Sequence, residues 1–249
     1  MGSRHPRPEP PAPAGESKDD SARADGPGAE RLLANDGTPV VRARAGGLLA
    51  RVALVGLGFG ALACIRAPNE NWSIYEIDPE LVRLSAESGL FRAMPTCAPD
   101  QTIVIGDARL TLADAKDPFD LIILDAYSSD NVPVHLLTRE AMALYRFLLR
   151  PDGAIVMNIT NRNIALSDIV AASAQAADLR MLHKRDPATP DFNATFWARA
   201  DIAALARDEK DFGALGPENG WTAPPLDPGF RTWTDDDSDI VGAILRHWR

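Results

Sequence analysis

The stretch RVALVGLGFG, residues 51–60, decides the fold of this chain. An apolar run leads into three glycines, and the ALACI segment that follows has the composition of a helix. This order predicts a strand, a tight glycine turn and a helix, an arrangement that lets backbone approach a ligand and points helix N–H groups at it. Such turns follow strands in many α/β proteins, so the later residues must show what this one binds. The glycines are Gly56, Gly58 and Gly60.

After the turn, short apolar runs alternate with segments of helical periodicity, which is typical of βαβ units. Asp78 and Pro79 fit the N-cap and the first residue of a helix. The fold class predicted is α/β, with a doubly wound, mostly parallel seven-stranded sheet. The expected strands are 51–56, 72–77, 102–106, 119–125, 153–159, 180–185 and 194–199; the expected helices are 60–67, 79–88, 138–150, 166–178 and one through 238–248, capped by Thr234 with Asp237 in its first turn.

The N-terminal residues differ in composition from the rest. Residues 1–38 are rich in Pro, Gly, Ser and charge, which predicts a disordered tail, and residues 39–249 are predicted to form one domain. The segment 38–47 is expected to add one strand or a lead-in. The net charge is −9, and residues 1–50 hold equal numbers of acidic and basic side chains, so the excess lies in the domain. An acidic domain argues against nucleic-acid binding and suits a cationic ligand, although ordinary solubility is the simpler explanation of the charge.

Two cysteines, Cys64 and Cys97, give neither a disulfide framework nor a zinc pattern. Both are expected to be free thiols in a reducing compartment, and no metal is expected. No apolar run approaches the roughly 20 residues that span a bilayer, and no apolar segment follows the basic N-terminus. The expected location is therefore the cytoplasm, without membrane contact.

In a doubly wound sheet, ligands bind beyond the carboxyl ends of the strands, so the residues that end each strand are the candidates. The first strand ends in the glycines, and the next three end at Glu76, Asp107 and Asp125. Glu76 lies 18 residues after Gly58, near the spacing at which an acid reaches ribose hydroxyls. A solvated strand-end acid is the alternative for Glu76, and a helix cap is the alternative to adenine contact for Asp107.

Asp125 has no helix to cap, because the next helix is expected only near residue 138. It ends an apolar strand and opens a loop, where binding residues concentrate, so a functional role is expected. The same loop holds Tyr127, Asp130 and His135. Asp130 fits either a second carboxylate for an amine or a turn residue, and His135 fits either a base or a neutral side chain bonded to a loop carbonyl.

The order of these blocks resembles the spermidine synthase-like proteins, a family with the S-adenosylmethionine-dependent methyltransferase fold, and in particular the bacterial domains often fused behind a membrane transporter. The resemblance covers residues 40–249, and without the transporter the chain is expected to be a free-standing relative. The blocks are GLGFG (56–60), YEID (75–78), GDAR (106–109), LDAYSSDNVPVHLLTREA (124–141), PDG (151–153), NITNR (158–162) and WTDDDSD (233–239).

The resemblance implies a Rossmann-like class I methyltransferase fold and a nucleotide donor, decarboxylated S-adenosylmethionine. The glycine turn, Gly56 to Gly60, would lie beside the methionine-derived portion of the donor. Glu76 would bind the ribose, and Asp107 would bind the adenine. Asp125, with Tyr127 and Asp130 in its loop, would orient and deprotonate the attacking amine. An alkyl amine is protonated near neutral pH and needs a base before it attacks carbon. A homodimer is compatible with the family.

Three departures from the synthases leave the activity open. Phe59 stands where they carry an acid that grips the aminopropyl ammonium. Asp125 and Asp130 are five residues apart, whereas the matching acids of the synthases are three apart. The N-terminal β-hairpin domain of the synthases has at most a short counterpart here. The hypotheses are aminopropyl transfer to a di- or polyamine, methyl transfer from intact S-adenosylmethionine to a small acceptor, and nucleotide binding without catalysis.

Overall fold

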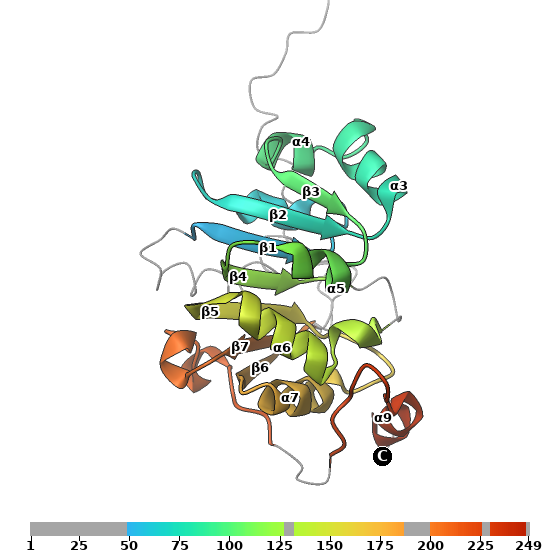
Figure 1. Ribbon diagram of the computed structural model, residues 1–249, viewed down its shortest axis with the longest axis vertical. Helices are drawn as coiled ribbons and strands as arrows, with labels where there is room; N and C mark the ends of the chain where they lie inside the picture. The colour runs from blue at the N-terminus through green and yellow to red at the C-terminus, as the bar shows by residue number, and fades with distance from the viewer. Residues whose placement is uncertain (1–48, 127–131, 187–199, 226–229, 248–249) are drawn as a thin grey trace, which may run out of the picture.

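A seven-stranded sheet organises the chain in this computed structural model, which describes residues 49–126, 132–186, 200–225 and 230–247 (Figure 1). The strand order is β3-β2-β1-β4-β5-β7-β6. The first five strands pair in parallel, and β7 runs antiparallel to both β5 and β6. The predicted doubly wound, mostly parallel sheet is confirmed. Its strands are β1 (Arg51–Val55), β2 (Asn71–Glu76), β3 (Thr102–Ile105), β4 (Phe119–Leu124), β5 (Leu149–Asn158), β6 (Arg180–Asp186) and β7 (Ala200–Ala206).

Strand β1 lies inside the sheet and is buried on both faces. Ala53 and Val55 pack into one apolar core, whereas Val52 and Leu54 pack into the other. A strand covered on both faces needs a continuous apolar sequence, which explains the VALV run. The chain leaves β1 toward β2 and β3 on one side, and β4 returns on the other, so the strand order reverses between β1 and β4.

Helices cover both faces of this sheet. In Figure 1, α5, α6 and α7 lie across the face toward the viewer. Residues of η2, α4 and η6 pack into the core of the opposite face. The α-helices are α3 (Pro79–Val82), α4 (Ala93–Cys97), α5 (Ala108–Thr111), α6 (Arg139–Leu148), α7 (Leu166–Ala176) and α9 (Ile240–His247); the shorter turns are η2 (Ala61–Ile65), η3 (Arg83–Glu87), η4 (Leu112–Asp114), η5 (Val134–Leu136), η6 (Glu209–Phe212) and η7 (Pro217–Asn219).

Side-chain caps begin several of these helices, and the predicted Asp78 cap is confirmed. The Asp78 carboxylate accepts a hydrogen bond from the Glu80 N–H at 2.9 Å, with Pro79 at the first position. The Thr138 hydroxyl accepts from the Ala141 N–H at 3.2 Å. The helix after the glycine turn is only the short 3₁₀ helix η2, shorter than predicted, because Ala67 precedes a proline and such residues disfavour helical backbone.

Other elements also differ from the prediction. Strand β5 begins at Leu149, because the Pro151–Gly153 segment continues the strand through an irregularity in its register with β4. The strand expected at 194–199 lies outside the described residues; the strand beside β5 is the alanine-rich Ala200–Ala206, where burial overrides helical propensity. The last helix begins at Ile240 rather than after Thr234, because Asp239 accepts from the Gly242 N–H at 2.7 Å.

Cys64 and Cys97 form a disulfide that joins η2 to α4, so the expectation of two free thiols is wrong. The two residues are 33 positions apart in the chain but their Cα atoms are 4.7 Å apart. Two cysteines without a motif could not show this pairing, since it depends on α4 packing against η2. Because the two cysteines are paired, they give no indication of a reducing compartment.

The C-terminal block WTDDDSD has a structural role between α5 and α6. Asp235 accepts a hydrogen bond from the Thr138 hydroxyl at 2.6 Å and contacts the Arg109 guanidinium at 3.3 Å. Trp233 is buried, and its carbonyl accepts from the Arg139 N–H. The segment therefore fastens the two helices that flank the sheet edge. Among the described residues, no helix is both long and apolar enough to cross a membrane.

Candidate active site

A pocket of about 310 Å³ lies at the carboxyl ends of the central strands, where the strand order reverses. This is the place where doubly wound sheets bind ligands. The glycine turn, Glu76, Asp107 and Asp125 meet there, although they come from four separate segments. The lining residues are Val55, Gly56, Gly58, Tyr75, Glu76, Ile77, Asp78, Leu81, Gly106, Asp107, Ala108, Asp125, Ala126, Pro133, His135 and Leu136.

The three glycines of the turn are required for different reasons. Gly56 has φ +94°, and a Cβ there would lie 2.7 Å from the Asp125 carbonyl carbon. Gly60 has φ +83°, and a Cβ there would lie 2.5 Å from Met94 on α4. Gly58 has φ +52° but open space around it. Only Gly58 therefore leaves room for a ligand, whereas the other two glycines permit close packing of the protein itself.

Glu76 lies at the end of β2 and is buried, with 6% of its surface exposed. Its two carboxylate oxygens accept hydrogen bonds from the Leu57 and Asp78 N–H groups, each at 2.9 Å. The first of these bonds fastens the glycine turn to β2. A carboxylate has about four lone-pair sites, so each oxygen retains acceptor capacity toward the pocket.

Asp107 and His135 lie at a different part of the pocket wall. One Asp107 oxygen accepts from the Arg109 N–H at 2.8 Å and so caps α5, as the sequence allowed. The other oxygen is 3.6 Å from His135 Nε2. His135 therefore belongs with Asp107, and the structure gives it a carboxylate partner rather than a loop carbonyl.

Asp125 follows β4, and its N–H donates to the Val55 carbonyl at 2.8 Å. The side chain lines the pocket and is partly buried, and this burial raises the pKa of the Asp125 carboxyl. The Asn158 amide donates to Asp125 Oδ1 at 2.9 Å and acts in the opposite direction, because it stabilises the anion. A carboxylate with a raised pKa binds a proton more readily, which suits the role of a general base.

Other candidates from the sequence lie elsewhere. Phe59 is 59% exposed, is not among the lining residues, and stacks on Phe91 with ring centroids 4.5 Å apart. Gly60 is also outside the lining. Tyr127 and Asp130 fall outside the described residues.

Sequence reasoning missed two features of this site. Ile77 is 65% exposed and lines the pocket, next to the buried Glu76. Asn158 ends β5 and contacts Asp125. Asn158 belongs to the NITNR block and could have been found by applying the strand-end rule to the fifth strand as well as to the first four.

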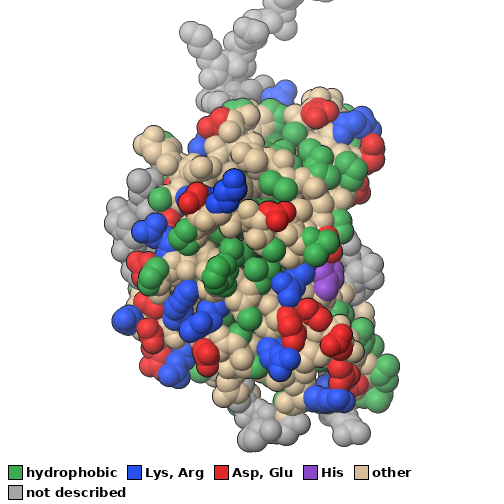
Figure 2. All heavy atoms as spheres, viewed as in Figure 1, with side chains coloured by type: hydrophobic (Ala, Val, Ile, Leu, Met, Phe, Trp, Pro, Cys, Tyr) green, Lys and Arg blue, Asp and Glu red, His purple; other side chains and the backbone are tan. Residues whose placement is uncertain are grey.

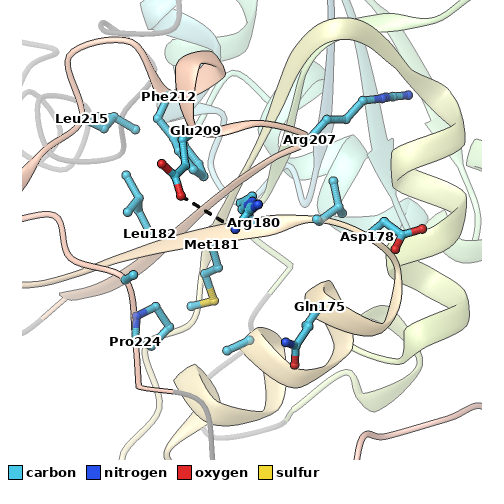
Figure 3. Close-up of a pocket in the computed structure, with 13 residues that line it drawn as sticks. Gln175, Asp178, Arg180, Met181, Leu182, Arg207, Glu209, Phe212, Leu215 and Pro224 are labelled. Carbon is cyan, nitrogen blue, oxygen red and sulfur yellow. Dashed lines mark ion pairs between the residues drawn. The ribbon is translucent and has the colours of Figure 1, made fainter.

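A larger hollow of about 670 Å³ lies at the far edge of the sheet, between β6, α7 and η6 (Figure 3). Its floor is apolar, with Met181 and Leu182, and Arg180 pairs with Glu209 across it at 3.7 Å. Arg207 turns its guanidinium away from Met181 and donates to backbone carbonyls of residues 146 and 149. Since the candidate acids line the smaller pocket, size does not identify the active site here.

The charge distribution of the described residues adds two observations. Basic and acidic side chains are interspersed over the face shown in Figure 2, rather than gathered into one basic surface. Within the described ranges, no group of three or more His, Cys, Asp or Glu side chains could hold a metal ion.

Comparison with known proteins gives partial relatives. No protein-family model matches the chain. It is 30% identical over 131 residues to a polyamine aminopropyltransferase of Vibrio vulnificus (strain CMCP6), which is 48% of this chain and 42% of that protein. It is 30% identical over 112 residues to a probable polyamine aminopropyl transferase of Bifidobacterium longum (strain NCC 2705), which is 42% of this chain and 24% of that protein. The chain thus spans less than half the length of these curated relatives.

A solved structure shows the same fold over most of the chain. The crystal structure of a probable spermidine synthase from Corynebacterium glutamicum ATCC 13032 aligns with a TM-score of 0.53 and 20% identity, covering 81% of this chain and 80% of that one. At this identity the likeness shows the fold alone. The sheet order agrees with this fold, and over just under half of its length the chain is similar in sequence to proteins named as polyamine aminopropyltransferases.

Proposed function

We propose that the protein is a transferase that moves an aminopropyl group from decarboxylated S-adenosylmethionine to a di- or polyamine. The observation that carries the proposal is Asp125, a partly buried carboxylate that lines the pocket at the point where the strand order reverses. The partial relatives named as polyamine aminopropyltransferases support the same activity. Both the donor and the amine are cations, and the pocket is lined by several carboxylates with His135 as its one basic group among the lining residues.

The pocket suits the nucleoside part of such a donor. Glu76 has acceptor capacity for the two ribose hydroxyls beyond its bonds to backbone. Ile77 and Leu136 offer apolar surface on which an adenine ring can pack, and Asp107 can accept from the adenine amino group. We infer that adenosine lies along the ends of β2 and β3, with the sulfonium toward Asp125.

The residues then support direct displacement. Asp125 takes a proton from the ammonium of the acceptor, and the freed nitrogen lone pair attacks the propyl carbon bonded to sulfur. The C–N bond forms as the C–S bond breaks, and the sulfur keeps the electron pair of that bond and leaves as neutral methylthioadenosine. Because the sulfonium is already a good leaving group, alignment and one base supply the catalysis.

One observation favours methyl transfer from intact S-adenosylmethionine as the second candidate. Phe59, at the position where the synthases carry an acid for the aminopropyl ammonium, has an aromatic partner in Phe91 instead of an opposite charge. A donor ammonium beside these rings would have cation–π contact in place of a carboxylate.

The decisive experiment supplies each donor separately. The purified full chain is incubated with putrescine or spermidine and either sulfonium donor, and the products are identified by mass spectrometry. Methylthioadenosine together with a lengthened polyamine is the expected result, and Asp125→Asn is the matched inactive control. S-adenosylhomocysteine with a methylated acceptor would instead establish methyl transfer. Donor binding without turnover over a broad amine panel would contradict both and leave a nucleotide-binding role.

A further inference from the structure

Strands β4 and β5 bring Asp125 and Asn158 side by side at the carboxyl edge of the sheet. The last pair in the parallel β4–β5 register is Leu124 with Met157, and each of the two polar residues directly follows its member of that pair. The Asn158 Nδ2 donates to Asp125 Oδ1 at 2.9 Å. In the described part of the chain, this amide is the only hydrogen-bond donor to the Asp125 side chain, and Oδ2 receives none.

The orientation of the Asn158 amide is set by its second bond. Its Oδ1 accepts from the Thr160 N–H at 3.0 Å, so a flipped amide would place two N–H groups against each other. The Thr160 hydroxyl in turn accepts from the Asp201 N–H at 3.0 Å, and the Ile159 N–H donates to the Asp201 carbonyl at 2.8 Å. The end of β5 is therefore fastened to the start of β7, and the amide keeps its NH₂ group on the side of Asp125.

We propose that Asn158 is a positioning residue, whose amide holds the Asp125 carboxylate in its charged form through Oδ1, so that Oδ2, which accepts from none of the described residues, can accept from the substrate amine. The proposal rests on the proposed function in taking Asp125 as the base. Burial alone raises the pKa of the Asp125 carboxyl, and a buried acid that stays protonated cannot accept a proton from the amine. Asn158 opposes this effect and keeps the carboxylate available.

The other titratable groups that line the pocket are contributed by neighbouring elements. They are Tyr75 and Glu76 of β2, Asp78 at the start of α3, Asp107 at the start of α5, and His135 on η5. On the β5 side, Asp201 lies beyond Thr160, where the Arg185 Nε contacts its carboxylate at 2.7 Å. Substitution at Asn158 leaves all of these groups in place, so a change in titration reports on the Asn158–Asp125 contact.

Two substitutions separate the effects of the two Asn158 hydrogen bonds, the one donated to Asp125 and the one accepted from the Thr160 N–H. Asn158→Leu removes both bonds of the amide. Asn158→Asp keeps an acceptor for the Thr160 N–H, so it preserves the loop anchor, but replaces the donor to Asp125 with an anion. The matched control is Asn161→Leu in the same loop: Asn161 is buried and its Oδ1 accepts from the Asn163 and Ile164 N–H groups, without bonding Asp125.

The first measurement does not need activity. Carbon-13 NMR of the aspartate carboxyls in the full chain follows the Asp125 titration, with the resonance identified by its loss in Asp125→Asn. We expect Asn158→Leu to raise the Asp125 midpoint by about one pH unit, and Asn158→Asp to raise it further as the two acids titrate together. Asn161→Leu should lower thermal stability and leave the midpoint unchanged. An unchanged midpoint in Asn158→Asp overturns the proposal, even if Asn158→Leu does not fold.

The second measurement is the pH profile of kcat/KM. In each Asn158 variant, the acid limb should move upward by the same shift as the NMR midpoint. At a pH below the midpoint, kcat/KM should fall about tenfold in Asn158→Leu and further in Asn158→Asp. It should recover on the plateau at higher pH, with donor Kd unchanged. A pH-independent loss of kcat would indicate a merely structural role and overturn the proposal. If the wild type transfers nothing while the NMR midpoint moves, the positioning of Asp125 stands and the proposed function falls.

Discussion

Gly56 and Asp125 are packed backbone against backbone, since a Cβ atom on Gly56 would lie 2.7 Å from the Asp125 carbonyl carbon. The end of β1 and the end of β4 can approach this closely only because the first residue of the turn has no side chain. The glycine turn therefore helps to place the proposed base, in addition to bordering the pocket.

Gly56→Ala should destabilise the protein by about 3 kcal/mol or more, because the added methyl group meets backbone that cannot rotate away. Gly58→Ala is the matched control and should lose only about 1 to 2 kcal/mol, since the space there is open and only the positive φ is unfavourable. Denaturant unfolding of both variants measures the difference. Equal losses would show that the contact with Asp125 is not the reason for the glycine.

Asp125→Asn should lower kcat/KM by about 10²- to 10⁴-fold, the usual contribution of a general base, because the amide cannot take a proton from the amine. Donor Kd should change little, since the shape of the side chain is kept. Asp114→Asn, at an exposed position, is the control and should behave as wild type. Turnover near the wild-type level in Asp125→Asn would remove Asp125 from the role of base.

The same substitution should stabilise the folded protein at neutral pH. Burial raises the pKa of the Asp125 carboxyl above its unfolded value, so the folded state binds more protons between the two pKa values. The free energy of unfolding therefore falls as pH rises through that window, and the ionised side chain is unfavourable above it. We expect the Tm of Asp125→Asn to exceed that of wild type at pH 7 by about 2–4 °C per kcal/mol relieved, with the gain disappearing below about pH 4. A lower Tm at pH 7 would contradict this.

The disulfide between Cys64 and Cys97 should stabilise the fold by about 2–4 kcal/mol, given the loop that it closes. Thermal unfolding of wild type should shift downward on addition of a reductant. The Cys64→Ala/Cys97→Ala double variant should unfold at the lower temperature with or without reductant. Alkylation of both thiols in the untreated, purified protein, detected by mass spectrometry, would contradict the pairing.

Phe59→Asp should shift donor preference toward decarboxylated S-adenosylmethionine, because a carboxylate at this position can pair with the aminopropyl ammonium. Phe91→Leu removes the ring stack without adding charge and should leave the preference unchanged. The ratio of kcat/KM for the two donors measures the effect. A constant ratio in Phe59→Asp would mean that this side chain does not contact the donor tail, in keeping with its place outside the pocket lining.

Much of the fold follows from short-range features of the sequence. The VALV run, the Asp78–Pro79 cap and the helical spacing of apolar residues in 138–150 act through neighbouring residues, so the corresponding elements are where the sequence indicates. The predictions of secondary structure are wrong where contact with a segment distant in the sequence determines the conformation. Strand β7 is alanine-rich and becomes a strand because it pairs with both β5 and β6.

The candidate site divides in the same way. The sequence alone indicates which strand ends carry glycine or acid, because the alternation of strands and helices is a local pattern. These positions are 56, 76, 107 and 125. Only the tertiary structure shows that Asn158 bonds Asp125, that Phe59 stacks on Phe91, and that Cys64 joins Cys97. These contacts depend on strand order and helix packing, which bring together residues 32 to 33 positions apart, and no local preference specifies which distant segment will be the neighbour.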